Sequence, residues 1–144
     1  MNSIEIHSYS GAKIRHFHKN ICSPNSKPQE KPEHVVISVG INDRNNSSNT
    51  HKDQIKKSVS VVKKTFPNAS IHIPLVNYSA QLKPEEKQSL ESFNNILETL
   101  SGHLQTFAVI PKLDPNLFNV ANDGIHWTNI TANAMLQHWL SHLN

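Results

Sequence analysis

Short apolar runs alternate along the chain with segments whose apolar residues recur at helical spacing, and this alternation most constrains the fold. The strand-like runs lie at residues 4–9, 34–39, 70–75 and 105–110. The run at 34–39 is predominantly apolar, as expected for a strand buried on both faces of a parallel sheet. Strands that alternate with helices favour an α/β fold with a parallel sheet and helices on both faces. The sequence therefore predicts parallel pairing among these runs.

Four helices are expected between and after the strands. Thr50 with Asp53 has the pattern of a capping box, and Pro84 suits the first turn of a later helix. Thr128 is the expected N-cap of the last helix. The expected buried stripes are Ile14, Phe17 and Ile21; Ile55, Val59, Val62 and Phe66; Leu90, Phe93, Leu97, Leu100 and Leu104; and Ala132, Met135, Leu136, Trp139, Leu140 and Leu143.

Length and composition limit the possible classes of protein. The chain has 144 residues, enough for one domain with a hydrophobic core and too few for two, so a single domain over residues 1–144 is expected. Its net charge of +3 comes from scattered lysines, which indicate nucleic acid only weakly. Cys22 has no disulfide partner within these residues. Without a membrane-length apolar run or a signal-peptide pattern, the expected location is the cytoplasm or nucleus, not outside the cell.

Small and polar residues follow the strand-like runs at three places. Gly11 follows the first run, and the segment Gly40-x-Asn42-Asp43 follows the second. The segment Asp123-Gly-Ile-His126 comes after the last run, just before the final helix. Because ligands of open parallel sheets bind outside the carboxyl ends of the strands, these three segments should converge on one edge.

The residues of these segments could supply several of the groups that acyl transfer requires. Such a reaction needs a nucleophile, a base, a group that orients the base, and donors for the developing oxyanion. His126 could be the base, and Asp123 could hold its other ring nitrogen. The backbone N–H of Gly11 and the side-chain amide of Asn42 could be the oxyanion donors. Glycine lets backbone approach the reacting atom closely, and an amide donates without adding charge.

Each of these residues also has a structural interpretation. Gly11 could be a simple turn residue, and the segment around Asn42 could be a turn held by Asx hydrogen bonds. Asp123 could stabilise the connection before the final helix, with His126 as a surface histidine. The order of the segments and their shared edge favour the functional interpretation.

Histidines are numerous, yet no metal site is expected. The chain contains ten, and the pairs His16/His18 and His138/His142 are close in sequence. Neither pair is accompanied by a cysteine or an acidic cluster that would complete a metal site.

Three segments together resemble a known family. Ser8-Tyr-Ser-Gly-Ala12, Val39-Gly-Ile-Asn-Asp43 and Asp123-Gly-Ile-His-Trp127 resemble, in this order, three of the four sequence blocks of the SGNH (GDSL-like) hydrolases. Within that superfamily they are most similar to the esterase domain of LINE-type retrotransposon proteins. The resemblance implies a flavodoxin-like three-layer α/β/α fold and a serine esterase acting on a small acyl ester, without metal or organic cofactor. It assigns Gly11 and Asn42 to the oxyanion hole and Asp123 and His126 to the catalytic triad.

The fourth block, Gly-Asp-Ser with the nucleophilic serine, is not found in the chain. In the family it lies on the first, central strand, so the resemblance describes an N-terminally truncated domain: a fragment, a decayed element or a degenerate enzyme. Ser8 and Ser10 lie on the oxyanion segment and are poor substitutes. We therefore expect little or no esterase activity from this chain. The alternatives are a non-catalytic SGNH-fold module for binding or self-association, and a binder of small acyl groups.

Overall fold

A three-stranded parallel sheet forms the centre of the computed structural model, which describes residues 32–143. Its strands are β1 (His34–Val36), β2 (Ser70–Pro74) and β3 (Ala108–Ile110), in the order β1-β2-β3. Both pairings are parallel, with Val35 opposite Ile71 and Ile73 opposite Val109. The predicted parallel α/β sheet is therefore confirmed for these strands. The strand expected at 4–9 and the helix expected over 14–21 lie outside the described residues.

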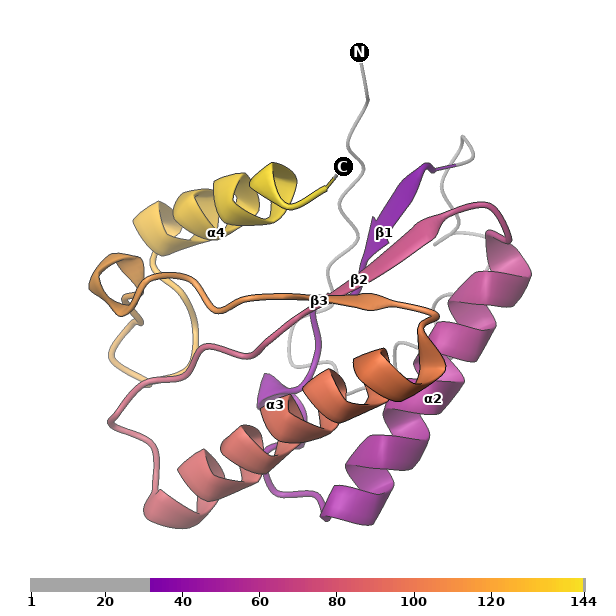
Figure 1. Cartoon of the computed structure of the whole chain (residues 1–144). Coiled ribbons are helices and arrows are strands. Elements are labelled where there is room, and N and C mark those ends of the chain that lie inside the picture. The colour runs from indigo at the N-terminus through magenta and orange to yellow at the C-terminus, as the bar shows by residue number, and fades with distance from the viewer. Residues whose placement is uncertain (1–31, 144) are drawn as a thin grey trace.

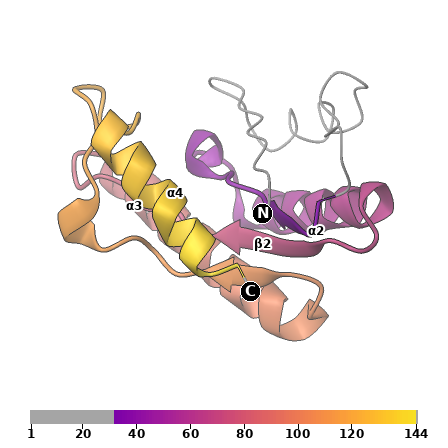
Figure 2. The ribbon, with the colours of Figure 1, turned by 90° about the horizontal axis from the view of Figure 1, so that it is seen from above.

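Helices cover both faces of the sheet, as the alternation predicts. Helices α2 (Ser48–Thr65) and α3 (Pro84–Leu104) lie side by side on one face, and α4 (Asn129–Ser141) lies on the other (Figures 1 and 2). Two short 3-10 helices, η2 (Ile41–Asp43) and η3 (Pro115–Leu117), lie in the loops that follow β1 and β3. No helix within residues 32–143 is long and apolar enough to cross a membrane.

The main core fills the space between the sheet and helices α2 and α3. Phe93, Leu90 and Leu97 of α3 are completely buried there. Burial of each such side chain stabilises the fold by about 1.5–3 kcal/mol. The other core residues include Ile37, Ile55, Val59, Val62, Ile71, Ile73, Val76, Leu82, Leu100 and Phe107. The expected stripes of α2 and α3 therefore face the core except at their last residues, where Phe66 is half-buried and Leu104 is 40% exposed.

Two of the three predictions of where helices begin are confirmed. Pro84 is the first residue of α3, and the Thr128 hydroxyl accepts a hydrogen bond from the Thr131 N–H as the N-cap of α4. The capping box at Thr50 is wrong, because α2 begins two residues earlier. There the N-cap is Ser47, whose hydroxyl accepts a hydrogen bond from the Thr50 N–H at 3.3 Å.

Two further expectations need correction. The run at 105–110 begins with the cap of α3, because Gln105 takes the left-handed conformation (φ 54°) and donates its N–H to the Ser101 carbonyl. Only residues 108–110 are extended as a strand. In α4, Met135 is buried as expected, but Ala132 is exposed.

Candidate active site

The turn after β1 depends on a glycine. Gly40 has φ +117°, a conformation that residues with a side chain rarely adopt. A Cβ at this position would also lie 2.7 Å from Cε1 of Phe93 and 3.0 Å from Cγ2 of Val76. Gly40 therefore allows the backbone to turn directly over a buried aromatic ring and to enter η2, which carries Asn42 and Asp43.

Hydrogen bonds hold the turn that contains Asp43. The Asp43 carboxylate accepts a hydrogen bond from the Asn46 side-chain amide at 2.9 Å, and the Asn46 N–H donates to the Asp43 carbonyl. The same carbonyl accepts from Nε2 of buried His51, whose ring stands edge-on to Phe93 at 5.1 Å. Half-buried Asn42 therefore lies next to a turn that several hydrogen bonds hold in place.

Two asparagines fix the loops that follow β2 and β3. The buried amide of Asn94, on α3, donates to the Val76 carbonyl at 3.0 Å and accepts from the Val76 N–H at 2.7 Å. Asn77 makes the same pair of bonds with the backbone of Leu113, at 3.0 and 2.9 Å. The sequence analysis missed both residues. The available signal was Asn94, a polar residue within the apolar stripe of α3.

The segment before α4 folds into a small hairpin. Val120 and Trp127 form an antiparallel bridge, and the Ala121 N–H donates to the His126 carbonyl at 2.7 Å. At the tip, Gly124 has φ +74° and donates its N–H to the Ala121 carbonyl. The hairpin therefore returns the chain on itself and presents Asp123 and His126 at its tip.

A buried threonine attaches this hairpin to α4. The Thr131 hydroxyl, which has no exposed surface, accepts a hydrogen bond from the Asn119 N–H at 2.8 Å and donates to the Leu117 carbonyl at 3.3 Å. On the same side, the rings of Trp127 and Trp139 meet edge-on at 6.0 Å. The two tryptophans therefore pack against each other.

Asp123 and His126 form the pair that the motif predicts. One carboxylate oxygen of Asp123 accepts the backbone N–H groups of Ile125 and His126 at 2.8 and 2.9 Å. The other accepts a hydrogen bond from Nδ1 of His126. The imidazole bond, followed by the two backbone bonds, lowers the pKa of Asp123 to about 2. Asp123 is therefore anionic at neutral pH and holds a proton on Nδ1, which leaves the lone pair of the His126 imidazole on Nε2.

Of the predicted site residues, Asn42, Asp123 and His126 lie within the described part of the chain. The His126 side chain is 68% exposed, so Nε2 is open to a substrate or to another side chain. The hydrogen bonds of Asp123 and His126 are to each other and to the hairpin backbone, and none reaches Asn42. Gly11, Ser8 and Ser10 lie outside the described residues. Their predicted positions at the site stay predictions.

A small cavity of about 50 Å³ lies beside the hairpin, where β1 and β2 end. Ser38 and Asn77 contribute polar groups to its wall, together with Trp127 and Trp139. The indole N–H of Trp139 is buried and meets no acceptor within residues 32–143. Binding sites for small molecules usually measure about 300–1,000 Å³, so this cavity would hold only a very small group. The sequence analysis did not single out Ser38.

The described residues contain no group of three histidine, cysteine, aspartate or glutamate side chains that could hold a metal ion.

Solved structures share this fold. The chain aligns with an alpha/beta hydrolase enzyme from the metagenome of Lake Arreo, Spain, with a TM-score of 0.65, 13% identity and coverage of 92% of this chain and 68% of that chain. It aligns with a family 3 carbohydrate esterase of Clostridium thermocellum with a TM-score of 0.64, 20% identity and coverage of 92% and 65%. For a lipase/acylhydrolase of Enterococcus faecalis the values are 0.65, 18%, 91% and 69%.

These matches show that the chain shares the α/β fold of these three proteins, as the alternation of strands and helices predicts. The chain spans about two thirds of the length of each of these three structures. In sequence, the chain matches no protein-family model and no curated protein.

Proposed function

We propose that this chain is an SGNH-type carboxylic-ester hydrolase domain of retroelement origin, located in the cytoplasm or nucleus, whose site is built for small acyl esters but is inactive in this chain by itself. One observation carries the proposal: Asp123 holds the His126 imidazole through Nδ1 and leaves Nε2 exposed at the edge of an esterase-like sheet. The three sequence blocks, which are most similar to the esterase domain of LINE-type retrotransposon proteins, support the proposed origin.

In the proposed reaction, Nε2 of His126 takes the proton of a serine hydroxyl as its oxygen attacks the ester carbonyl. Asp123 stays ionised and stabilises the imidazolium. The Asn42 amide and the Gly11 N–H donate to the developing oxyanion. His126 then gives its proton to the leaving alcohol, and a water activated by Nε2 hydrolyses the acyl-enzyme.

The nucleophile decides whether this chain is active by itself. Within residues 32–143 no serine hydroxyl is hydrogen-bonded to His126. A site with a base and oxyanion donors but no triad serine retains only about 10³–10⁴-fold acceleration over water. We therefore propose that the 144-residue polypeptide shows little or no ester hydrolysis and that a strand ending in Gly-Asp-Ser completes the site.

The test uses the purified 144-residue chain and a form extended at its N-terminus by a strand that ends in Gly-Asp-Ser. Hydrolysis of a short-chain aryl ester and labelling by a fluorophosphonate probe are measured for both. The proposal expects both signals in the extended form and their loss on His126→Ala, with His142→Ala, another exposed histidine, as the matched control. An extended form that folds but stays unreactive would contradict the hydrolase proposal. Stoichiometric labelling of the unextended chain would contradict its inactivity.

The alternative is a non-catalytic module for binding or self-association, with nucleic acid as a minor possibility. The small size of the cavity that Trp127 and Trp139 line favours this alternative, because an ester substrate needs more room than about 50 Å³. Analytical ultracentrifugation separates the two functions. A stable oligomer together with an unreactive extended form would support the module, and a monomer with a reactive extended form would support the enzyme.

A further inference from the structure

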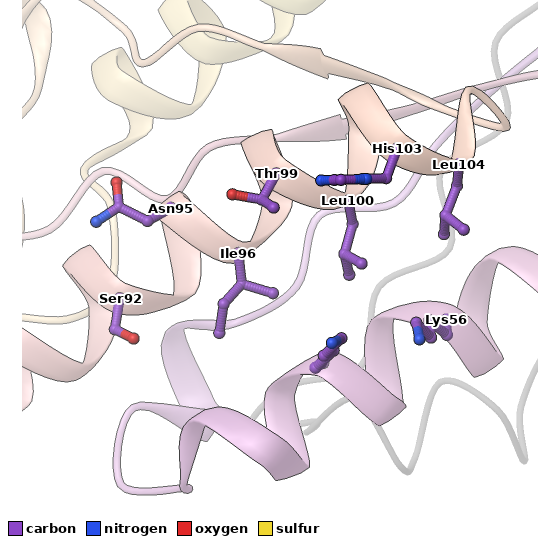
Figure 3. Close-up of a pocket in the computed structure, with 9 residues that line it drawn as sticks. Lys56, Ser92, Asn95, Ile96, Thr99, Leu100, His103 and Leu104 are labelled. Carbon is purple, nitrogen blue, oxygen red and sulfur yellow. The ribbon is translucent and has the colours of Figure 1, made fainter.

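A groove separate from the candidate active site runs between α2 and α3. Its volume is about 470 Å³, which falls within the range of about 300–1,000 Å³ typical of small-molecule sites. Lys52 and Lys56 of α2 form one wall, and residues from Ser92 to Leu104 of α3 form the other. Figure 3 shows Lys56 on α2, across the groove from the labelled side chains of α3. None of its lining residues belongs to the hairpin of His126.

The floor of the groove is apolar. Ile96, Leu100 and Leu104 recur at every fourth residue of α3 and point toward α2 (Figure 3). Leu100 is buried, Ile96 is half-buried and Leu104 is 40% exposed. This row extends for about 12 Å along the helix axis, at 1.5 Å per residue. Leu104, which the helical pattern predicts to be buried, is therefore the most exposed member of this apolar strip along the groove.

The charge of the groove has a single sign. Its lining includes Lys52, Lys56 and His103 and no acidic residue. Neither lysine has a carboxylate partner within the described part of the chain, where Glu91 pairs with Lys112 and Glu86 pairs with Arg44. A ligand with an anionic head would therefore meet two unpaired ammonium groups beside the apolar strip.

We infer that this groove binds a straight-chain amphiphile with a carboxylate head. Its alkyl chain lies along Ile96, Leu100 and Leu104, and its carboxylate pairs with Lys52 and Lys56. A ten-carbon chain, with C–C bonds of about 1.5 Å, roughly matches the length of the apolar strip. The inference does not depend on the hydrolytic centre, because the groove shares no residue with it.

The experiment titrates the ¹⁵N-labelled full chain with decanoate below its micelle concentration, followed by NMR. Saturable shifts are expected at Ile96, Thr99 and His103, with smaller shifts at the His126 hairpin. The double variant Lys52→Ala/Lys56→Ala should weaken binding by about 3- to 10-fold, the effect of two exposed ion pairs. Uncharged decanol should bind the two proteins equally well.

A matched double variant on the same helix provides the control. Lys63→Ala/Lys64→Ala removes the same charge from the last turn of α2, outside the groove, and should change decanoate binding by less than about twofold. Equal weakening by both double variants would overturn the inference, because net charge alone would then explain it. An absence of saturable shifts in the groove would overturn it too. So would binding to anionic vesicles without binding of free decanoate, which would identify a membrane-surface contact.

Discussion

Replacement of Gly40 by alanine should destabilise the protein strongly, because two independent effects act at this position. The backbone has φ +117°, and holding a residue with a side chain in so sparsely populated a region costs about 1–3 kcal/mol. The new Cβ would also lie 2.7 Å from the ring of Phe93, which is completely buried, so the ring or the turn would have to shift. Overpacking of this kind adds about 1–3 kcal/mol. We expect a loss of about 3 kcal/mol or more in the free energy of unfolding, and a melting temperature lower by roughly 10 °C.

Gly102→Ala is the matched control for this experiment. Gly102 lies in the last turns of α3, and apart from its chain neighbours and the helix's own backbone no atom lies within 4 Å of a Cβ built there. The same substitution should therefore stabilise the protein by about 0.5–1 kcal/mol, through helix propensity alone. Urea unfolding of the two variants should give shifts of opposite sign. A Gly40→Ala loss below about 1 kcal/mol would refute the close packing of the turn against Phe93.

Two other predictions concern the attachment of the hairpin and the sheet. Thr131→Val removes a buried hydroxyl and leaves the Asn119 N–H without its acceptor, so the protein should lose about 2 kcal/mol of stability and hydrogen exchange in the hairpin should accelerate. Thr65→Val, which removes only a hydroxyl bond to a helix carbonyl, is its control. Equal losses of stability in the two variants would refute the role of Thr131 in attaching the hairpin to α4. Separately, burial and then the neighbouring His34 lower the pKa of His72 below its usual 6.5. The unfolded chain therefore binds the proton more tightly, and stability should fall as pH drops below 6.5; urea titrations with no decrease between pH 7.5 and 5.5 would contradict this.

The sequence predicts the fold well where the burial of an element requires its residues to be apolar. The runs at 34–39, 70–75 and 105–110 each contain a strand, because a strand covered on both faces needs apolar residues throughout. The ends of the elements were less accurate, since local hydrogen bonds decide them. Ser47 caps α2 before the expected start, and Gln105 adopts a left-handed cap where a strand was expected.

The candidate site likewise contains one feature that the local sequence predicts and others that it does not. The pairing of Asp123 with His126 follows from three residues of local sequence, and it is present in the structure. The residues that fix the neighbouring loops form hydrogen bonds with backbone that is distant in sequence. Asn94 bonds to backbone 18 residues away, and Asn77 bonds to backbone 36 residues away. The local pattern marks Asn94 only as a polar residue within an apolar stripe and does not reveal its partner, because these contacts exist only once the sheet has brought the loops together.

The protonation of His126 decides whether this residue can act as the base. If Asp123 holds Nδ1–H, the neutral ring must carry its proton on Nδ1 and leave Nε2 free as the base. Long-range ¹H–¹⁵N NMR of the ¹⁵N-labelled chain at neutral pH distinguishes the two tautomers. We predict a protonated Nδ1 and an unprotonated Nε2 for His126, with this preference lost on Asp123→Ala. A predominantly Nε2-protonated ring in the unaltered chain, or a tautomer that Asp123→Ala leaves unchanged, would contradict the assignment of the pair as a base and its orienting carboxylate.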